Sequence, residues 1–160
     1  MTWVDFAIAV LLVGAVALEI KRGFGAALFD ALAVVISMRA AYLLVNPDTG
    51  VFKAYWADVP AHAGFGYLFA FIGFCVVTLF IAHLIYGTLL FSADVFDPLL
   101  GGIMGIVVGV TICHVLVSSL TMMELPGGGE NAVKYSAFAP ELLNFTMYHN
   151  VLNLMETLGQ

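Results

Sequence analysis

The stretch GYLFAFIGFCVVTLFIAHLIYGTLLF, residues Gly66–Phe91, decides the fold class of this chain. It contains no Asp, Glu, Lys or Arg, and it exceeds the roughly 20 apolar residues that a helix needs to cross a bilayer core. Three other stretches are similarly long and apolar: Trp3–Ile20, Phe24–Val45 and Leu99–Thr121. Because lipid cannot satisfy an open backbone, such segments must be helical. The sequence therefore predicts an all-α integral membrane protein with four transmembrane helices.

The composition supports this fold class and excludes some functions. Hydrophobic residues make up 62% of the chain and charged residues only 10%, with a mean hydropathy of +1.05. A soluble domain carries about 25% charged residues. Five Lys and Arg residues cannot form a basic patch, so we expect no nucleic-acid partner. The net charge of −6 is spread over loops and helix ends, which is typical of solvated loop charge.

The segments between the spans indicate how the chain is organised. Only residues 21–23 separate the first two spans and residues 92–98 the last two, so we expect two hairpins. Residues 1–125 then form one four-helix domain, and a Pro-Gly-Gly-Gly segment opens a linker over residues 126–139. Residues 140–160 separate polar from apolar side chains at helical spacing, which predicts an amphipathic surface helix on lipid or on the four-helix domain.

The few basic residues predict the orientation in the membrane. Lys21 and Arg22 share one short loop, which the positive-inside rule places in the cytoplasm. Both termini are then extracytoplasmic.

Four ionisable residues inside or beside the spans are candidate functional groups, because each is costly in lipid unless it is paired or hydrated. At about 100° per residue, Asp30 and Arg39 face opposite sides of the second span and cannot pair with each other. Their depths suggest His83 as a partner for Asp30, and Asp5 as a partner for Arg39. Asp30 and His83 could form part of a relay for protons or a solute, or they could form a structural hydrogen bond between helices. A single pair of this kind does not define a pathway across the membrane.

Small residues recur every fourth position in two of the spans. The fourth span contains Gly101, Gly105 and Gly109, and the second span has the same spacing at Gly23, Ala27 and Ala31. Such spacing lets helix backbones approach closely in lipid. The pattern predicts packing faces, which either join the second and fourth spans or face a partner subunit.

Motifs for catalysis, metals and cofactors are missing from the sequence. It contains no GxSxG, HExxH, P-loop or dinucleotide fingerprint. Cys75, Cys113 and His114 lie at similar depth, but they lack the spacing and number of ligands typical of a metal site. We expect a protein that is not an enzyme and that binds neither metal nor cofactor.

Three parts of the chain resemble the colicin V production protein family of small bacterial inner-membrane proteins. The first is Asp5 followed by the hairpin Lys21-Arg22-Gly23-Phe24. The second is the stretch from Phe96 to Gly105 with Gly109, which contains Asp97, Gly101 and the glycine repeat. The third is Tyr135-Ser136 with Pro140 before a final helix.

The resemblance implies an inner-membrane protein that is linked to production or export of the toxin colicin V and to envelope processes. In some relatives, an extracytoplasmic protease domain follows a similar membrane unit, which agrees with a C-terminus outside. Our leading hypothesis is a non-enzymatic protein that assembles through its helices with itself or with another inner-membrane protein. The alternative is a small oligomeric transporter or channel that uses Asp30, Arg39 and His83.

Overall fold

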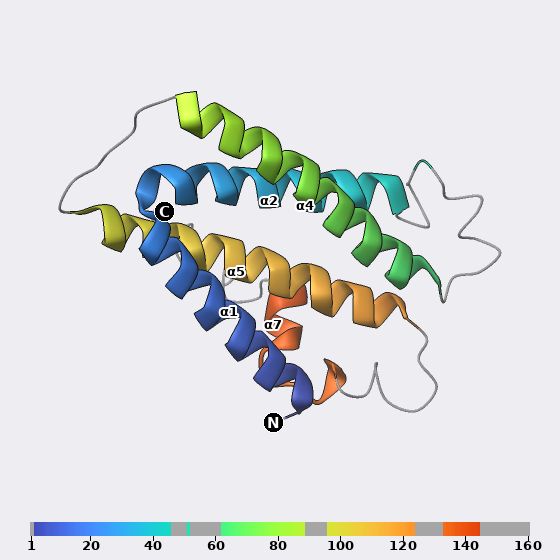
Figure 1. Cartoon of the computed structure of the whole chain (residues 1–160). Helices are drawn as coiled ribbons and strands as arrows, with labels where there is room; N and C mark the ends of the chain where they lie inside the picture. The colour runs from blue at the N-terminus through green and yellow to red at the C-terminus, as the bar shows by residue number, and fades with distance from the viewer. Residues whose placement is uncertain (1, 46–50, 52–61, 89–95, 124–132, 145–160) are drawn as a thin grey trace, which may run out of the picture.

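The computed structural model describes residues 2–45, 51, 62–88, 96–123 and 133–144, and these residues are helical with short turns (Figure 1). Four helices are long and apolar enough to cross a membrane, which confirms the predicted fold class. A fifth, short helix follows them. The helices are α1 (Trp3–Arg22), α2 (Phe24–Val45), α4 (Ala63–Thr88), α5 (Asp97–Met122) and α7 (Ala139–Asn144).

Local sequence explains where these helices begin and end. The backbone N–H of Thr2 donates to the carboxylate of Asp5 at 2.7 Å, as in one half of a capping box at the start of α1. α1 ends at Gly23, whose φ of 81° is one that residues with a Cβ rarely adopt. Pro98 lies in the first turn of α5, where its missing N–H costs nothing.

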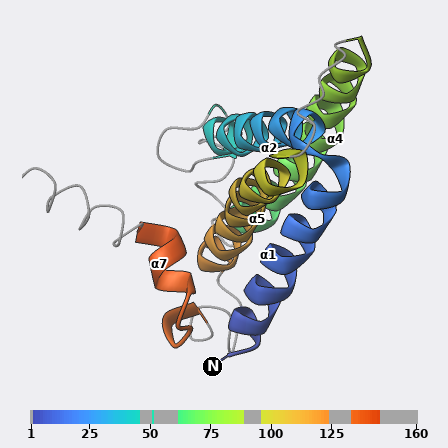
Figure 2. The same cartoon turned by 90° about the vertical axis from the view of Figure 1, so that its left-hand side faces the viewer.

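α5 is the central helix of the bundle and contacts α1, α2, α4 and α7 (Figures 1 and 2). The largest interfaces join α1 to α5 and α2 to α4, whereas α1 and α2 contact each other little and diverge from the turn at Gly23. The first two spans therefore form a V rather than a closed hairpin. The close backbone contacts of α1 are instead with the glycines of α5.

The outer surface of the bundle is apolar, as a lipid environment requires. In an apolar 18-residue stretch of α4, only 11% of the residues are buried inside the bundle, whereas 44% are buried in the corresponding stretch of α5. Phe69, Val76 and Phe80 on α4 are more than 60% exposed, and they would be costly to expose to water. The fold is that of a multi-pass membrane protein.

Some predicted boundaries were wrong by a few residues. α1 continues through Lys21 and Arg22 to Gly23, and α5 begins at Asp97 instead of Leu99. Part of the predicted linker is ordered against the bundle, because Val133, Ser136 and Ala139 are buried. Of the predicted C-terminal helix, α7 covers Ala139–Asn144, and residues 145–160 lie outside the described part of the chain.

Candidate functional site

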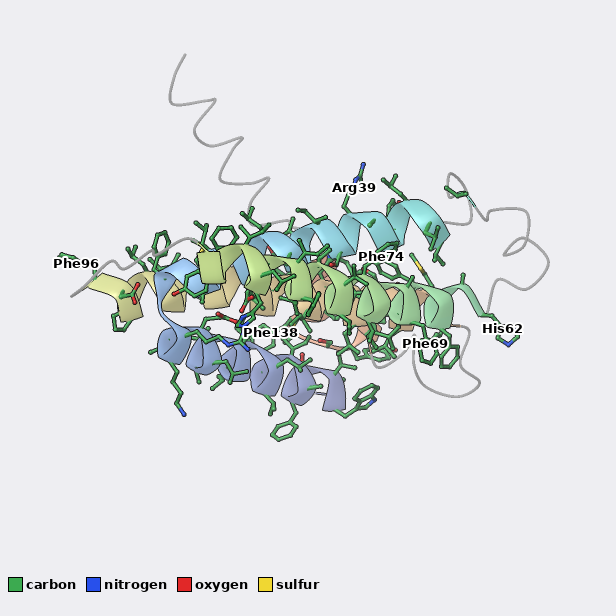
Figure 3. All side chains as sticks on the ribbon, turned by 45° about the horizontal axis from the view of Figure 1, so that its top comes forward. Arg39, His62, Phe69, Phe74, Phe96 and Phe138 are labelled. Atoms are coloured by element: carbon green, nitrogen blue, oxygen red, sulfur yellow. The ribbon has the colours of Figure 1, made fainter. Side chains whose placement is uncertain are left out.

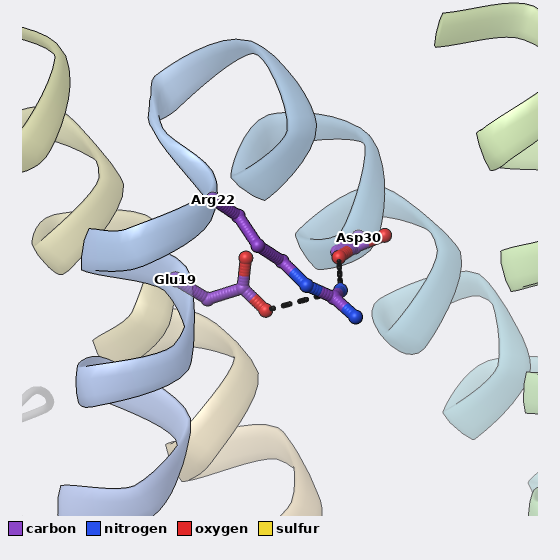
Figure 4. A network of polar contacts seen from close by, with 3 residues as sticks. All are labelled: Glu19, Arg22 and Asp30. Carbon is purple, nitrogen blue, oxygen red and sulfur yellow. Dashed lines mark hydrogen bonds and ion pairs between the residues drawn. The ribbon is translucent and has the colours of Figure 1, made fainter. Parts of the chain in front are cut away.

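A cluster of three charged side chains lies where α1 and α2 join (Figure 4). Arg22, in the last turn of α1, forms an ion pair with Asp30 of α2. Its guanidinium also lies 3.9 Å from the carboxylate of Glu19, one turn earlier on α1. The turn at Gly23 brings these residues together because it places α2 directly beside the end of α1. Two carboxylates and one guanidinium leave this cluster with a formal charge of −1.

Glu19 is the least satisfied member of the cluster. Its side chain is buried and accepts no hydrogen bond from any described residue, and its Oε2 atom has no partner. A buried carboxylate that lacks hydrogen bonds is costly. Glu19 lies inside the predicted first span, Trp3–Ile20, and was not among the candidate residues predicted from the sequence.

Two hollows meet at this charged cluster. One, of about 320 Å³, lies in the V between α1 and α2, over α5, and we call it the α1–α2 groove. The other, of about 430 Å³, lies between α2 and α4. Arg22 and Asp30 line both, Glu19 lines only the groove, and His83 lines only the second hollow. The walls of the groove away from these charges are apolar.

The turn at Gly23 is fastened to the start of α5. The carboxylate of Asp97 accepts a hydrogen bond from the backbone N–H of Phe24 at 2.7 Å, which satisfies a free donor at the start of α2. A methyl group at Gly23 would collide with that carboxylate. Gly101, one turn further along α5, packs closely on the end of α1. A methyl group at Gly101 would lie 2.6 Å from the Glu19 carbonyl oxygen.

The glycines of α5 form the interface with α1, which the sequence did not predict. A methyl group at Gly105 would lie 2.7 Å from the Cα of Val16, and one at Gly109 would lie 2.8 Å from Leu12. The glycine ridge therefore packs inside the chain rather than against a partner subunit. In α2, Ala27 and Ala31 are buried.

Asp5 organises the opposite end of α1. One oxygen of this buried carboxylate accepts hydrogen bonds from the hydroxyl of Ser136 at 2.5 Å, from the N–H of Ala137 at 2.9 Å and from the N–H of Phe138 at 3.2 Å. The Ser136 hydroxyl in turn accepts from the N–H of Ala139 at 2.9 Å, where α7 begins. Pro140 follows in the first turn of α7. Asp5 thus fixes the segment before α7 to α1.

The predicted partners of Asp30 and Arg39 were wrong. Asp30 pairs with Arg22 and forms no hydrogen bond with His83, which is exposed on α4. Asp5 is occupied by the Ser136 segment and does not meet Arg39. Arg39 is exposed and projects away from the bundle (Figure 3), with its guanidinium 5.8 Å from the ring centre of Tyr42.

Sequence reasoning also missed two polar contacts between helices. The hydroxyls of Ser37 on α2 and Thr78 on α4 are hydrogen-bonded at 2.7 Å. On α5, the Nδ1 atom of His114 lies 2.8 Å from the Leu142 carbonyl oxygen, and its Nε2 atom lies 3.4 Å from the hydroxyl of Ser118. Ser37 and Thr78 lie in mainly apolar stretches of the sequence, which gave no signal of their contact. Ser118 lies four residues after His114, a spacing that places both on one face of a helix.

The remaining candidate ligands do not gather around a common point. The thiol of Cys113 lies 3.6 Å from the carbonyl oxygen of Ile8 on α1, whereas Cys75 lies on α4 near Ser37. Among the described residues, no three His, Cys, Asp or Glu side chains are close enough together to hold a metal ion.

Comparisons with known proteins place this architecture in one family. No curated protein and no solved structure is significantly similar to the chain. The family model described as colicin V production protein matches residues 4–147, a range that includes all four spans apart from Trp3, the Glu19–Arg22–Asp30 cluster and the Asp5–Ser136 contact. The chain belongs to the colicin V production protein family.

Proposed function

We propose that this protein is a non-enzymatic assembly protein of the bacterial inner membrane. It supports toxin production or export, or a related envelope process, by binding another membrane protein through its helices. The α1–α2 groove carries this proposal. It is open, apolar and about 320 Å³ in volume, and it lies between two membrane-spanning helices that diverge instead of packing together.

The interior of the bundle argues against self-assembly through the glycine ridge. Gly101, Gly105 and Gly109 are all occupied by α1 of the same chain, so a partner must use another face. Gly14 on α1 offers one, because a methyl group there would meet nothing within 4 Å and because Gly14 lines the groove. Small residues at an open helix surface are the usual contact points for a second helix in lipid.

The same geometry gives little support to an enzyme or a transporter. Ser118 and His114 are the nearest approach to a nucleophile and a base, but 3.4 Å is long for a hydrogen bond that would activate a hydroxyl. Arg39 and His83 are both exposed and do not share a hollow. Within the described ranges, these polar groups do not form a continuous path across the bundle.

We also propose that the turn at Gly23 faces the cytoplasm. Lys21 and Arg22 are the only basic residues beside that turn, and both are exposed. The Glu19–Arg22–Asp30 cluster then lies near the cytoplasmic surface, and the Asp5–Ser136 contact lies near the extracytoplasmic surface. Labelling of single cysteines at positions 21 and 135 in intact cells tests this, since only position 135 should react with an impermeant reagent.

Native mass spectrometry of the protein extracted in native-lipid particles tests the assembly proposal. Gly14→Leu puts a side chain at the groove, where an added Cβ atom meets nothing within 4 Å, and Gly73→Leu is the matched control at another open position, on α4. We expect wild type and Gly73→Leu to retain a stoichiometric membrane partner and Gly14→Leu to lose it. A deletion strain complemented with Gly14→Leu should then secrete less colicin V. A wild-type protein that is a partnerless monomer would refute the proposed function.

A further inference from the structure

The charged cluster beside the α1–α2 groove has two carboxylates and one guanidinium among the described residues. Asp30 takes the strong ion pair with Arg22, so Glu19 is left with one contact of 3.9 Å to the same guanidinium. Glu19 is 4% exposed, and its Oε2 atom has no hydrogen-bond partner. The groove is therefore lined by a buried carboxylate that shares its cation, Arg22, with Asp30.

Neighbouring charges do not supply a second cation. Lys21 is exposed and does not line the groove, and Asp97 adds a third carboxylate on the α5 side of the turn, where it accepts a hydrogen bond from the N–H of Phe24. His83 lies in the other hollow. A second cation that pairs with the ionised form of Glu19 would come from outside the described part of the bundle, by way of the groove. Because the last torsion of a Glu side chain is broad, either carboxylate oxygen can turn toward it.

The rest of the groove fits an apolar helix rather than a soluble ligand. Its walls include Val10, Leu11, Leu18 and Val34, and it opens sideways from helices that cross the membrane. Gly14 faces this opening with no side chain of its own, so another backbone can approach α1 closely there. An acyl chain would fill the apolar part but would bring no positive charge to Glu19.

We propose that the α1–α2 groove binds one transmembrane helix of another protein, and that this helix carries a Lys or Arg that pairs with Glu19. The inference rests on the proposed assembly function and names the chemical class of the partner. Burying a Lys or Arg in lipid is costly, and pairing it with a buried carboxylate offsets that cost for both proteins. The charge also fixes the depth of the partner helix, because only one register places it beside Glu19.

The α4 helix of a second copy is a poor fit to this groove. Residues Ala63–Thr88 contain no Lys or Arg, so that exposed apolar helix cannot supply the charge. This excludes α4 of a second copy as the source of the charge, and the crosslink distinguishes a different protein from the exposed Arg39 on α2 of a second copy.

Photo-crosslinking in cells tests this inference. The photoreactive residue p-benzoyl-phenylalanine replaces Leu18, which is 59% exposed and lines the groove, or Val13, which is 67% exposed and does not. We expect Leu18 to crosslink to a membrane-spanning peptide that contains Lys or Arg, and Val13 to give no such product. In the Glu19→Gln background, which keeps the size of the side chain, the yield should fall at least about tenfold because the charge pair is lost.

A mutant cycle then separates pairing from folding. The Lys or Arg of the crosslinked peptide is changed to Gln, alone and together with Glu19→Gln. The double variant should lose no more crosslinking than either single variant, since all three lack the same pair. Unchanged thermal unfolding of purified Glu19→Gln shows that the bundle is intact.

Several outcomes would overturn the inference. They are lipid adducts alone at Leu18, a crosslinked peptide without a basic residue, a crosslink to a second copy, or equal yields at Leu18 and Val13. If a partner still copurifies with the wild type in any of these cases, the assembly function stands and only the charged-helix partner is wrong. If no partner copurifies at all, the proposed function fails first.

Discussion

Removing the Ser136 hydroxyl should release the segment before α7 from the bundle. In Ser136→Ala, the carboxylate of Asp5 loses its shortest hydrogen bond, of 2.5 Å, and the N–H of Ala139 loses its acceptor. A hydrogen bond to a charged group contributes about 1.5–3 kcal/mol. Loss of a helix-capping acceptor costs about 1 kcal/mol more. The local opening free energy should therefore fall by roughly 2.5–4 kcal/mol.

Amide hydrogen exchange measures that change directly. At about 1.4 kcal/mol for each factor of ten, exchange at residues 137–142 should become roughly 10²- to 10³-fold faster, while amides in the middle of α5 keep their wild-type rates. Tyr135→Phe is the matched control, because it removes a hydroxyl from the neighbouring residue, which is 72% exposed. The reasoning would be refuted by wild-type exchange in Ser136→Ala, or by equal acceleration in Tyr135→Phe.

The helix junctions give three further predictions, each measured by thermal unfolding in detergent. Gly105→Ala should destabilise the protein by about 1–3 kcal/mol, because the new methyl group presses on the backbone of α1. Gly23→Ala should cost about 1–3 kcal/mol for its positive φ, and more for the collision with Asp97. Gly73→Ala on α4 serves as control for both and should not destabilise the protein, because its methyl group meets nothing within 4 Å and Ala favours a helix over Gly by up to about 1 kcal/mol. Ser37→Ala removes one hydroxyl contact between α2 and α4 and should cost only about 0.6 kcal/mol; a loss comparable to Gly105→Ala would contradict this ranking.

The sequence was sufficient to predict the four spans because their signal is local and strong. Each span is a long apolar run. Gly23 and Pro98 lie where helices end or begin, directly after α1 and in the first turn of α5. The predicted end of the first span was too early because Lys21 and Arg22 form the last turn of α1 rather than a loop.

The contacts between helices were less predictable, because depth in the membrane does not determine how a helix is rotated. Asp30 and His83 were matched by depth alone, yet Arg22 competes for Asp30 and is much closer to it. Asp5 and Arg39 were matched in the same way, but the Ser136 segment returns from the far end of the chain to bind Asp5. The spacing of the α5 glycines correctly indicated a close contact, and only the identity of the facing helix was missing.

The residues that carried the family resemblance meet at the two ends of α1. At one end, Gly23 packs on Asp97, and Gly101 packs on the last turns of α1. At the other end, Asp5 binds Ser136 directly before α7. α1 is therefore fixed at both ends, while its side that faces α2 remains open as the groove.

A groove held in this way has little freedom to close when it is empty, so a partner helix would not have to bear the cost of ordering it. The same attachments make a testable distinction between positions on α1. Loosening either end, by Ser136→Ala or Gly23→Ala, should weaken partner binding without touching the groove, whereas Gly14→Leu should weaken it with both ends intact. Equal partner binding in wild type and in the two end variants would show that fixing α1 does not prepare the groove for its partner.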